Sequence, residues 1–146
     1  PRWNLWFIIV KRDIYLKAFE ILNLKDRIIM AEDALMSFVL WNLSNKFCHI
    51  CDILYYYRQN ENSTTRSKND EIISRNSKDR VFVIKKIKEL SKKHKFDRKI
   101  TKVFIDNLKI HEYYDRLIYH QISKRVFKIY DKYFRFKRRL RVKFGI

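Results

Sequence analysis

Residues 32–43 read Glu-Asp-Ala-Leu-Met-Ser-Phe-Val-Leu-Trp-Asn-Leu, and this stretch decides how the chain folds. Apolar side chains would lie on nearly every side of a helix with this sequence, which is typical of a helix that is buried on most sides. The two acids at its start suit the first turn of a helix, where the macrodipole favours negative charge. We therefore predict a buried helix from Glu32 to Leu43.

The residues around this segment predict short elements of both kinds. Residues 5–10 form an apolar run typical of a buried strand or a short buried helix, and Asp13 is a good N-cap for a helix over residues 14–22. Residues 47–51 and 53–57 are rich in β-branched and aromatic side chains, which favours two short strands or one bent strand. The polar residues 59–69 have the composition of a loop.

The second half of the chain changes to a helical period. Three apolar stripes predict three amphipathic helices with basic outer faces, with breaks near residues 95–96 and 110–111. The stripes are Val83, Ile87 and Leu90; then Ile100, Val103, Phe104 and Leu108; then Leu117, Ile118, Ile122, Val126, Ile129, Tyr130 and Tyr133. The sequence thus predicts two parts, residues 1–65 with mixed elements and residues 66–146 as an all-α basic extension. This is an α+β chain that is mostly helical overall.

Composition and charge exclude several classes of function. The chain has 146 residues with one glycine and one proline, so it lacks the glycines that phosphate-binding loops and dinucleotide fingerprints need. The net charge of +18 is uneven: residues 1–65 hold 8 Lys/Arg and 7 Asp/Glu (+1), and residues 66–146 hold 26 and 9 (+17). The second part should therefore attract polyanions such as acidic lipid headgroups, nucleic acid or an acidic partner.

The two cysteines, Cys48 and Cys51, predict no disulfide framework, which fits a reducing, cytoplasmic compartment. A structural zinc site needs four ligands, and no second Cys or His pair follows at a suitable spacing. We therefore expect buried free thiols and no metal site. The apolar runs at residues 5–10 and 34–41 are shorter than the roughly 20 residues that a membrane span needs. The chain opens with Pro1 and not with Met, so we expect a fragment.

An ordered series of short motifs runs through residues 3–65. It consists of Trp3-Asn4, Lys11-Arg12-Asp13, Glu32-Asp33, Leu54-Tyr55-Tyr56-Tyr57-Arg58 and Asn62-Ser63-Thr64-Thr65. This series resembles the acceptor-side half of family 2 glycosyltransferases of the GT-A type, which build bacterial surface polysaccharides. The resemblance implies that residues 1–65 end a Rossmann-like α/β catalytic domain whose nucleotide-binding half is missing here. It also implies inverting transfer of a sugar from a nucleotide sugar to a glycan or lipid-linked acceptor.

The resemblance also implies roles for individual residues. Asp33 would be the base that takes the proton from the acceptor hydroxyl, with Glu32 orienting it or contacting the acceptor. The alternative is a purely structural role, in which both acids lie in the first turn and interact favourably with the helix dipole. Substrate would be bound by Trp3, Asn4, Tyr57, Arg58, Ser63 and Thr65, although Arg58 could equally be a surface arginine after an edge strand.

Two departures from the family pattern limit this resemblance. The lysine that follows "W-N" in the family is Leu5 here. The metal-binding "D-x-D" segment is absent, so Mg²⁺ or Mn²⁺ is expected for the complete enzyme with no ligands in this chain. Isolated residues 1–146 should therefore not transfer sugar.

Residues 134–144 interleave aromatic side chains with cations. This pattern favours peripheral contact with acidic lipid at the inner face of the cell membrane. Nucleic-acid binding is less favoured because no zinc finger, RNP-like motif or helix-turn-helix pattern is present. A solvated basic face stays open as a third interpretation. The alternative to an enzyme is thus a basic helical binding module for nucleic acid or an acidic membrane, without catalysis.

Overall fold

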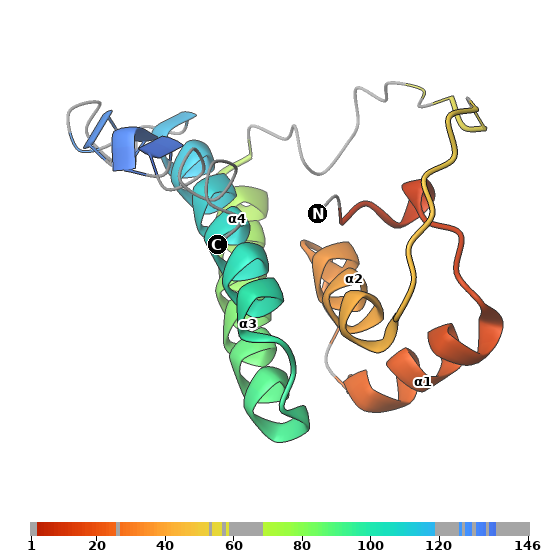
Figure 1. Cartoon of the computed structure of the whole chain (residues 1–146). Helices are drawn as coiled ribbons and strands as arrows, with labels where there is room; N and C mark the ends of the chain where they lie inside the picture. Colours follow the sequence, from red (N-terminus) through yellow and green to blue (C-terminus); the bar gives the residue numbers. More distant parts are fainter. Residues whose placement is uncertain are drawn as a thin grey trace.

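The computed structural model describes residues 3–25, 27–52, 54–56, 58, 69–118, 126, 128–129, 131–133 and 135–136. Within these ranges the chain forms a short 3₁₀ helix and four longer helices (Figure 1). They are η1 (Leu5–Phe7), α1 (Arg12–Leu22), α2 (Glu32–Leu43), α3 (Asp70–His94) and α4 (Arg98–Ile118). The helices α3 and α4 form an antiparallel hairpin, and α2 lies between this hairpin and α1.

Helix α2 is the centre of the packing, and the prediction of a buried helix over residues 32–43 is confirmed. Seven consecutive residues of α2, from Ala34 to Leu40, are buried. Burial on all sides requires partners on all sides, and α2 contacts α1, α3 and α4. The apolar side chains that turn in every direction from this helix therefore set the positions of the other three.

Aromatic and aliphatic side chains from three helices fill the core. Phe38 of α2 is fully buried and makes edge-to-face contacts with Phe96 and Phe104, each with ring centroids 5.6 Å apart. The predicted stripe of α3 lies in the same core, together with Phe104 and Leu108 of α4. The predicted boundary near residue 65 lies outside the described residues, and the described parts on either side of it share this one core.

The ends of the hairpin helices follow from local chemistry. The Asn69 side chain accepts hydrogen bonds from the N–H groups of Glu71 and Ile72 at the start of α3. Lys95 adopts the left-handed conformation (φ 53°, ψ 39°) and ends α3, so the predicted break near residues 95–96 is confirmed. The Asp97 side chain then accepts from the Ile100 N–H (2.8 Å) and caps α4.

Two predicted helix ends are wrong. Helix α4 continues through residues 110–111 to Ile118, because no glycine, proline or capping side chain interrupts the helical period there. Helix α1 begins at Arg12 after Lys11, which has no side-chain cap bond, so Asp13 lies in the first turn and is not the N-cap. An acid in the first turn still interacts favourably with the dipole.

The predicted α+β fold with a Rossmann-like GT-A sheet is wrong. Residues 47–51 and the described part of 53–57 are extended chain, and no strand occurs within the described ranges. The apolar run at residues 5–10 holds the single turn η1 instead of a strand. β-branched and aromatic residues favour a strand only when a neighbouring strand accepts their backbone bonds, and the described residues offer none. None of the described helices combines the length and apolar character needed to cross a membrane.

Truncating the buried Phe38 side chain should lower the free energy of unfolding far more than truncating an exposed phenylalanine. We expect Phe38→Ala to lower the free energy of unfolding by about 3–5 kcal/mol, because it removes a fully buried side chain and leaves a cavity. The matched control is Phe19→Ala on α1, where 63% of the residue is exposed and the cost should stay below about 1 kcal/mol. Urea denaturation followed by circular dichroism measures both. Equal losses for the two variants would contradict this description of the core.

Candidate functional site

The acidic pair lies where the chain enters α2. Ala31 precedes the pair in the left-handed conformation (φ 68°, ψ 16°), which is unfavourable for a residue with a β-carbon by roughly 1 kcal/mol. No side chain caps this helix end, since the N-cap position is an alanine. Glu32 is exposed and Asp33 is half-buried. The left-handed Ala31 thus makes the turn from which α2 begins, with Glu32 and Asp33 in its first turn.

Asp79 of α3 holds this entry turn in place. Its Oδ2 atom accepts hydrogen bonds from the backbone N–H groups of Ile29 (3.0 Å) and Met30 (3.1 Å). A carboxylate that accepts two backbone N–H groups makes strong, charge-assisted bonds. Because α3 is part of the packed core, these bonds connect the strained turn before Glu32 to a rigid support.

The N-terminal segment runs beside the first two turns of α2. The Leu5 backbone N–H donates to the Asp33 carboxylate, and the Ser37 hydroxyl, one turn further along, donates to the Trp3 carbonyl at 2.6 Å. The half-buried Asn4 lies between these two attachments in the sequence. The structure thus places the Trp3-Asn4 segment beside the first turns of α2, which begin with Glu32 and Asp33.

The electrostatic environment raises the pKa of both acids. Burial is the main cause of the raised pKa of Asp33, and the Leu5 N–H bond opposes it. Burial also raises the pKa of Glu32, with further contributions from the negative charges of Asp33 and Asp79, while a backbone hydrogen bond opposes the shift. Three carboxylates therefore interact at the start of one helix. Such clusters with perturbed pKa values are common at functional sites, although they also occur in purely structural networks.

The Trp3 ring packs against α4 and does not point freely into solvent. It lies 6.5 Å from the Phe104 ring and 5.0 Å from the His111 ring, measured between centroids. Partial desolvation lowers the pKa of His111, and the nearby Arg80 cation lowers it further while Asp115 opposes the shift. Trp3 therefore anchors the N-terminal segment to the hairpin.

The predicted closing segment is placed only in part. Tyr55 stacks on Trp6 with ring centroids 6.4 Å apart and an interplanar angle of 28°, so residues 54–56 lie beside η1. Tyr56 is 83% exposed, because no described element covers the extended chain here. Arg58 is exposed, and Tyr57, Ser63 and Thr65 lie outside the described residues.

The thiols of Cys48 and Cys51 are exposed, so the prediction of buried cysteines is wrong. The expectation of burial rested on a strand that does not form. Cys51 Sγ lies 3.6 Å from His49 Nδ1. Across the part of the chain that the structure describes, no three His, Cys, Asp or Glu side chains gather closely enough to hold a metal ion. The described residues thus offer no ligand set for Mg²⁺ or Mn²⁺.

A second charged cluster joins α3 to α4 next to Asp79 in the sequence. Arg80, which follows Asp79, is buried and forms ion pairs with Glu112 (3.2 Å) and Asp115 of α4. The Ser77 hydroxyl donates to the same Glu112 carboxylate. Removing one partner of a buried ion pair leaves a buried charge uncompensated, so this cluster fixes α4 against the part of α3 that carries Asp79.

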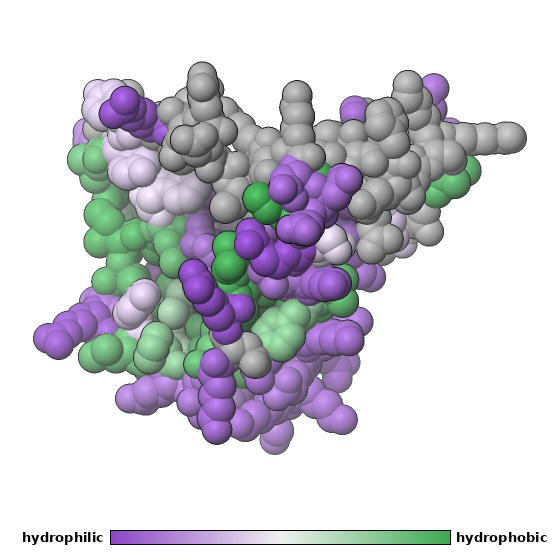
Figure 2. Space-filling model, turned by 180° about the vertical axis from the view of Figure 1, so that it is seen from behind, coloured by the Kyte–Doolittle hydropathy of each residue, from purple (hydrophilic) through white to green (hydrophobic). Residues whose placement is uncertain are grey.

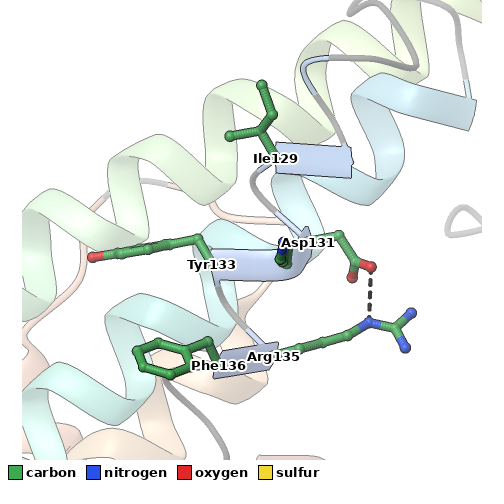
Figure 3. Close-up of a pocket in the computed structure, with 6 residues that line it drawn as sticks. Ile129, Asp131, Tyr133, Arg135 and Phe136 are labelled. Atoms are coloured by element: carbon green, nitrogen blue, oxygen red, sulfur yellow. Dashed lines mark ion pairs between the residues drawn. The ribbon is translucent and has the colours of Figure 1, made fainter.

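The predicted membrane segment 134–144 is described only at Arg135 and Phe136, and both are exposed. These two residues line a surface pocket together with Ile129, Asp131, Lys132 and Tyr133 (Figure 3). Asp131 pairs with Arg135 (2.8 Å) and accepts a hydrogen bond from Tyr114 of α4 (2.9 Å). Figure 3 shows Tyr133 and Phe136 pointing to the side opposite this ion pair. The pocket is formed by one short segment and contains none of the predicted catalytic residues.

Sequence reasoning missed Asp79, which is the residue that supports the acidic pair. Nothing in the sequence marks it, because it lies on a helix that otherwise reads as part of a basic extension, 50 residues after Ile29.

Comparison with known proteins gives no match: no protein-family model, no curated protein and no solved structure is significantly similar to this chain.

Loss of the Asp79 carboxylate should loosen the entry turn of α2. We expect Asp79→Ala to lower the free energy of unfolding by about 2 kcal/mol, because the Ile29 and Met30 N–H groups lose a charged acceptor. Amide hydrogen exchange at residues 29 and 30 should speed up more than exchange in the core. The control is Lys78→Ala, an exposed neighbour on the same helix. Unchanged exchange at both amides would show that Asp79 does not hold the turn.

The raised pKa of Asp33 predicts a specific dependence of stability on pH. The folded state holds the Asp33 proton more tightly than the unfolded chain, so stability falls as the pH rises from below about 4 through the raised pKa. Asp33→Asn cannot ionise, and its amide oxygen can still accept from Leu5. We expect this variant to melt at a higher temperature than the wild type at pH 7 and at the same temperature near pH 3. Thermal melts at the two pH values decide the point, and a lower melting temperature at pH 7 would refute it.

Proposed function

We propose that this chain provides the acceptor side of an inverting glycosyltransferase, with Asp33 as the general base. The observation that carries the proposal is the partly desolvated Asp33 carboxylate, held at the start of a buried helix beside the Trp3-Asn4 segment. The order of motifs in residues 3–65 supports the same assignment. The donor would be a nucleotide sugar, bound by residues outside this sequence, and the acceptor a glycan or a lipid-linked sugar.

Inverting sugar transfer needs a carboxylate that accepts the proton of the acceptor hydroxyl. The acceptor hydroxyl oxygen attacks the anomeric carbon of the donor, the bond from that carbon to the nucleoside diphosphate breaks, and the hydroxyl proton moves to the Asp33 carboxylate. The diphosphate leaves with the electron pair of the broken bond, and the configuration at the anomeric carbon inverts. A general base works best when its pKa lies near the working pH, and desolvation moves the pKa of Asp33 in that direction.

Glu32 and Asp79 have supporting parts in this proposal. The negative charge of Asp79 acts on Glu32, whose exposed carboxylate is free to contact the hydroxyl groups of an acceptor. Arg58 would approach the departing diphosphate, for which its planar guanidinium is suited. The alternative, that Glu32 and Asp33 only relieve the dipole of α2, predicts no link between their ionisation and sugar transfer.

The test is sugar transfer by a protein that joins this chain to the nucleotide-sugar-binding residues that the proposal requires, at saturating donor and acceptor. We expect Asp33→Asn to lower the turnover rate by about 10²–10⁴-fold, because asparagine cannot accept the proton, while donor affinity stays nearly unchanged. Glu32→Gln should cost less. The matched control is Glu20→Gln, which removes an exposed acid from α1 outside the motif series and should leave turnover unaltered.

Two results would contradict the proposal. The first is an Asp33→Asn variant that keeps more than a third of the wild-type turnover rate, which would reduce Asp33 to a helix-start acid. The second is transfer by the 146 residues alone, because the proposal assigns donor binding to residues outside them. Saturation-transfer NMR with oligosaccharides on the isolated chain tests acceptor binding independently of catalysis.

A further inference from the structure

Charge is segregated along the α3–α4 hairpin. Residues 85–102, which span the turn between the helices, hold nine Lys/Arg and two acids, a net charge of +7. Residues 70–80 and 106–116, at the other end of the two helices, hold five Lys/Arg and six acids, a net charge of −1. We call residues 85–102 the hairpin tip. A field of one sign concentrated at one end of a rigid element attracts and orients an anionic surface.

The cations of the hairpin tip are available to a partner. All of them except the half-buried Lys86 are exposed: Lys85, Lys88, Lys92, Lys93, Lys95, Arg98, Lys99 and Lys102. The two acids of the tip are already engaged, since Glu89 pairs with Lys86 and Asp97 caps α4. The positive field at the tip is therefore little reduced by local pairing.

The hairpin tip is also held rigidly against the core. Phe96 packs edge-to-face on the buried Phe38, and the Asp97 N–H donates to the Asn42 side chain at 3.0 Å. The hydroxyls of Ser91 and Thr101 lie 2.9 Å apart and join the two helices just behind the turn. The cations thus project from a fixed framework, so docking them would require little ordering of the backbone.

Apolar side chains lie at the same end of the molecule. Helix α1 buries only Ala18 and Leu22 and leaves Phe19 63% and Leu16 47% exposed. In Figure 1, α1 and the turn of the hairpin occupy the same, lower end of the fold. Figure 2, from behind, shows mostly hydrophilic side chains at that end, with single hydrophobic side chains among them on the side where α1 lies.

We propose that the hairpin tip and the exposed face of α1 together form a docking surface for a lipid bilayer rich in anionic phospholipids. Cations near such a surface are attracted to it electrostatically, and aromatic and aliphatic side chains such as Phe19 and Leu16 enter the interface. Nucleic acid would use the cations equally well, but it would leave the apolar face of α1 without a role. This inference is independent of the proposed sugar transfer.

The experiment is cosedimentation of the full 146-residue chain with vesicles of phosphatidylcholine alone and with 30% phosphatidylserine, over a range of salt concentrations. Two triple variants remove the same net charge at different places. Lys92→Gln, Lys93→Gln and Lys99→Gln alter the tip, whereas Lys78→Gln, Lys109→Gln and Lys128→Gln alter exposed lysines elsewhere. Each cation at the surface contributes about a fivefold factor in partitioning, so the tip variant should bind acidic vesicles at least tenfold more weakly than the control variant.

A third variant, Phe19→Ser, separates a bilayer from other polyanions. We expect it to weaken binding to acidic vesicles severalfold and to leave binding to duplex DNA unchanged. Salt should weaken all vesicle binding, because screening acts over about 10 Å at 0.1 M. The inference is overturned if the two triple variants bind acidic vesicles equally, which would assign attraction to charge elsewhere, including residues 134–144. It is also overturned if the wild type prefers DNA to acidic vesicles or binds neutral vesicles equally well.

Discussion

A helix with apolar side chains all around must be covered all around, and the rest of the structure depends on this constraint at α2. Its burial from Ala34 to Leu40 brings α1 to one side and the α3–α4 hairpin to the other. The acidic pair begins the same helix, so its carboxylates are attached to the most constrained element of the fold. Burial of apolar area supplies the driving force for this arrangement, and the polar contacts at its ends determine details of orientation.

The polar contacts at the start of α2 are unfavourable in part, and this is informative. An alanine adopts the left-handed conformation, and three carboxylates, including Asp79, interact near it. The bonds from Ile29 and Met30 to Asp79 compensate some of this cost. Strain and like-charge repulsion that persist at one point of a fold are common where a site needs a fixed, partly desolvated charge.

The sequence allowed the helical elements to be predicted better than the fold class. The bounds of α2 and the break at residues 95–96 follow from local signals, namely a run of apolar residues and a change of period. The prediction of strands at residues 47–51 and 53–57 was wrong, because a strand needs a partner strand that its own residues do not specify. The prediction that Cys48 and Cys51 are buried was wrong for the same reason, since the extended chain leaves both cysteines exposed.

The candidate site shows the same division between local and distant signals. The resemblance assigned Trp3, Asn4 and Asp33 to one site, and this assignment stays a prediction; in the structure the Trp3-Asn4 segment runs beside the start of α2. Asp79 could not be found in this way, because its contact joins residues 50 positions apart and depends on how α3 packs. No pattern in a single sequence indicates a contact between such distant residues, so this contact is found only in the three-dimensional fold.

Lys95 shows how one residue can serve two opposed demands. It ends α3 in a left-handed conformation in which glycine is the commonest residue, and a side chain there is unfavourable by roughly 1 kcal/mol. Glycine at this turn would therefore make the hairpin more stable and at the same time less basic. Stability of the turn and positive surface charge therefore favour different residues at this position. Lys95 thus places a cation at a position where glycine would form the turn at lower cost.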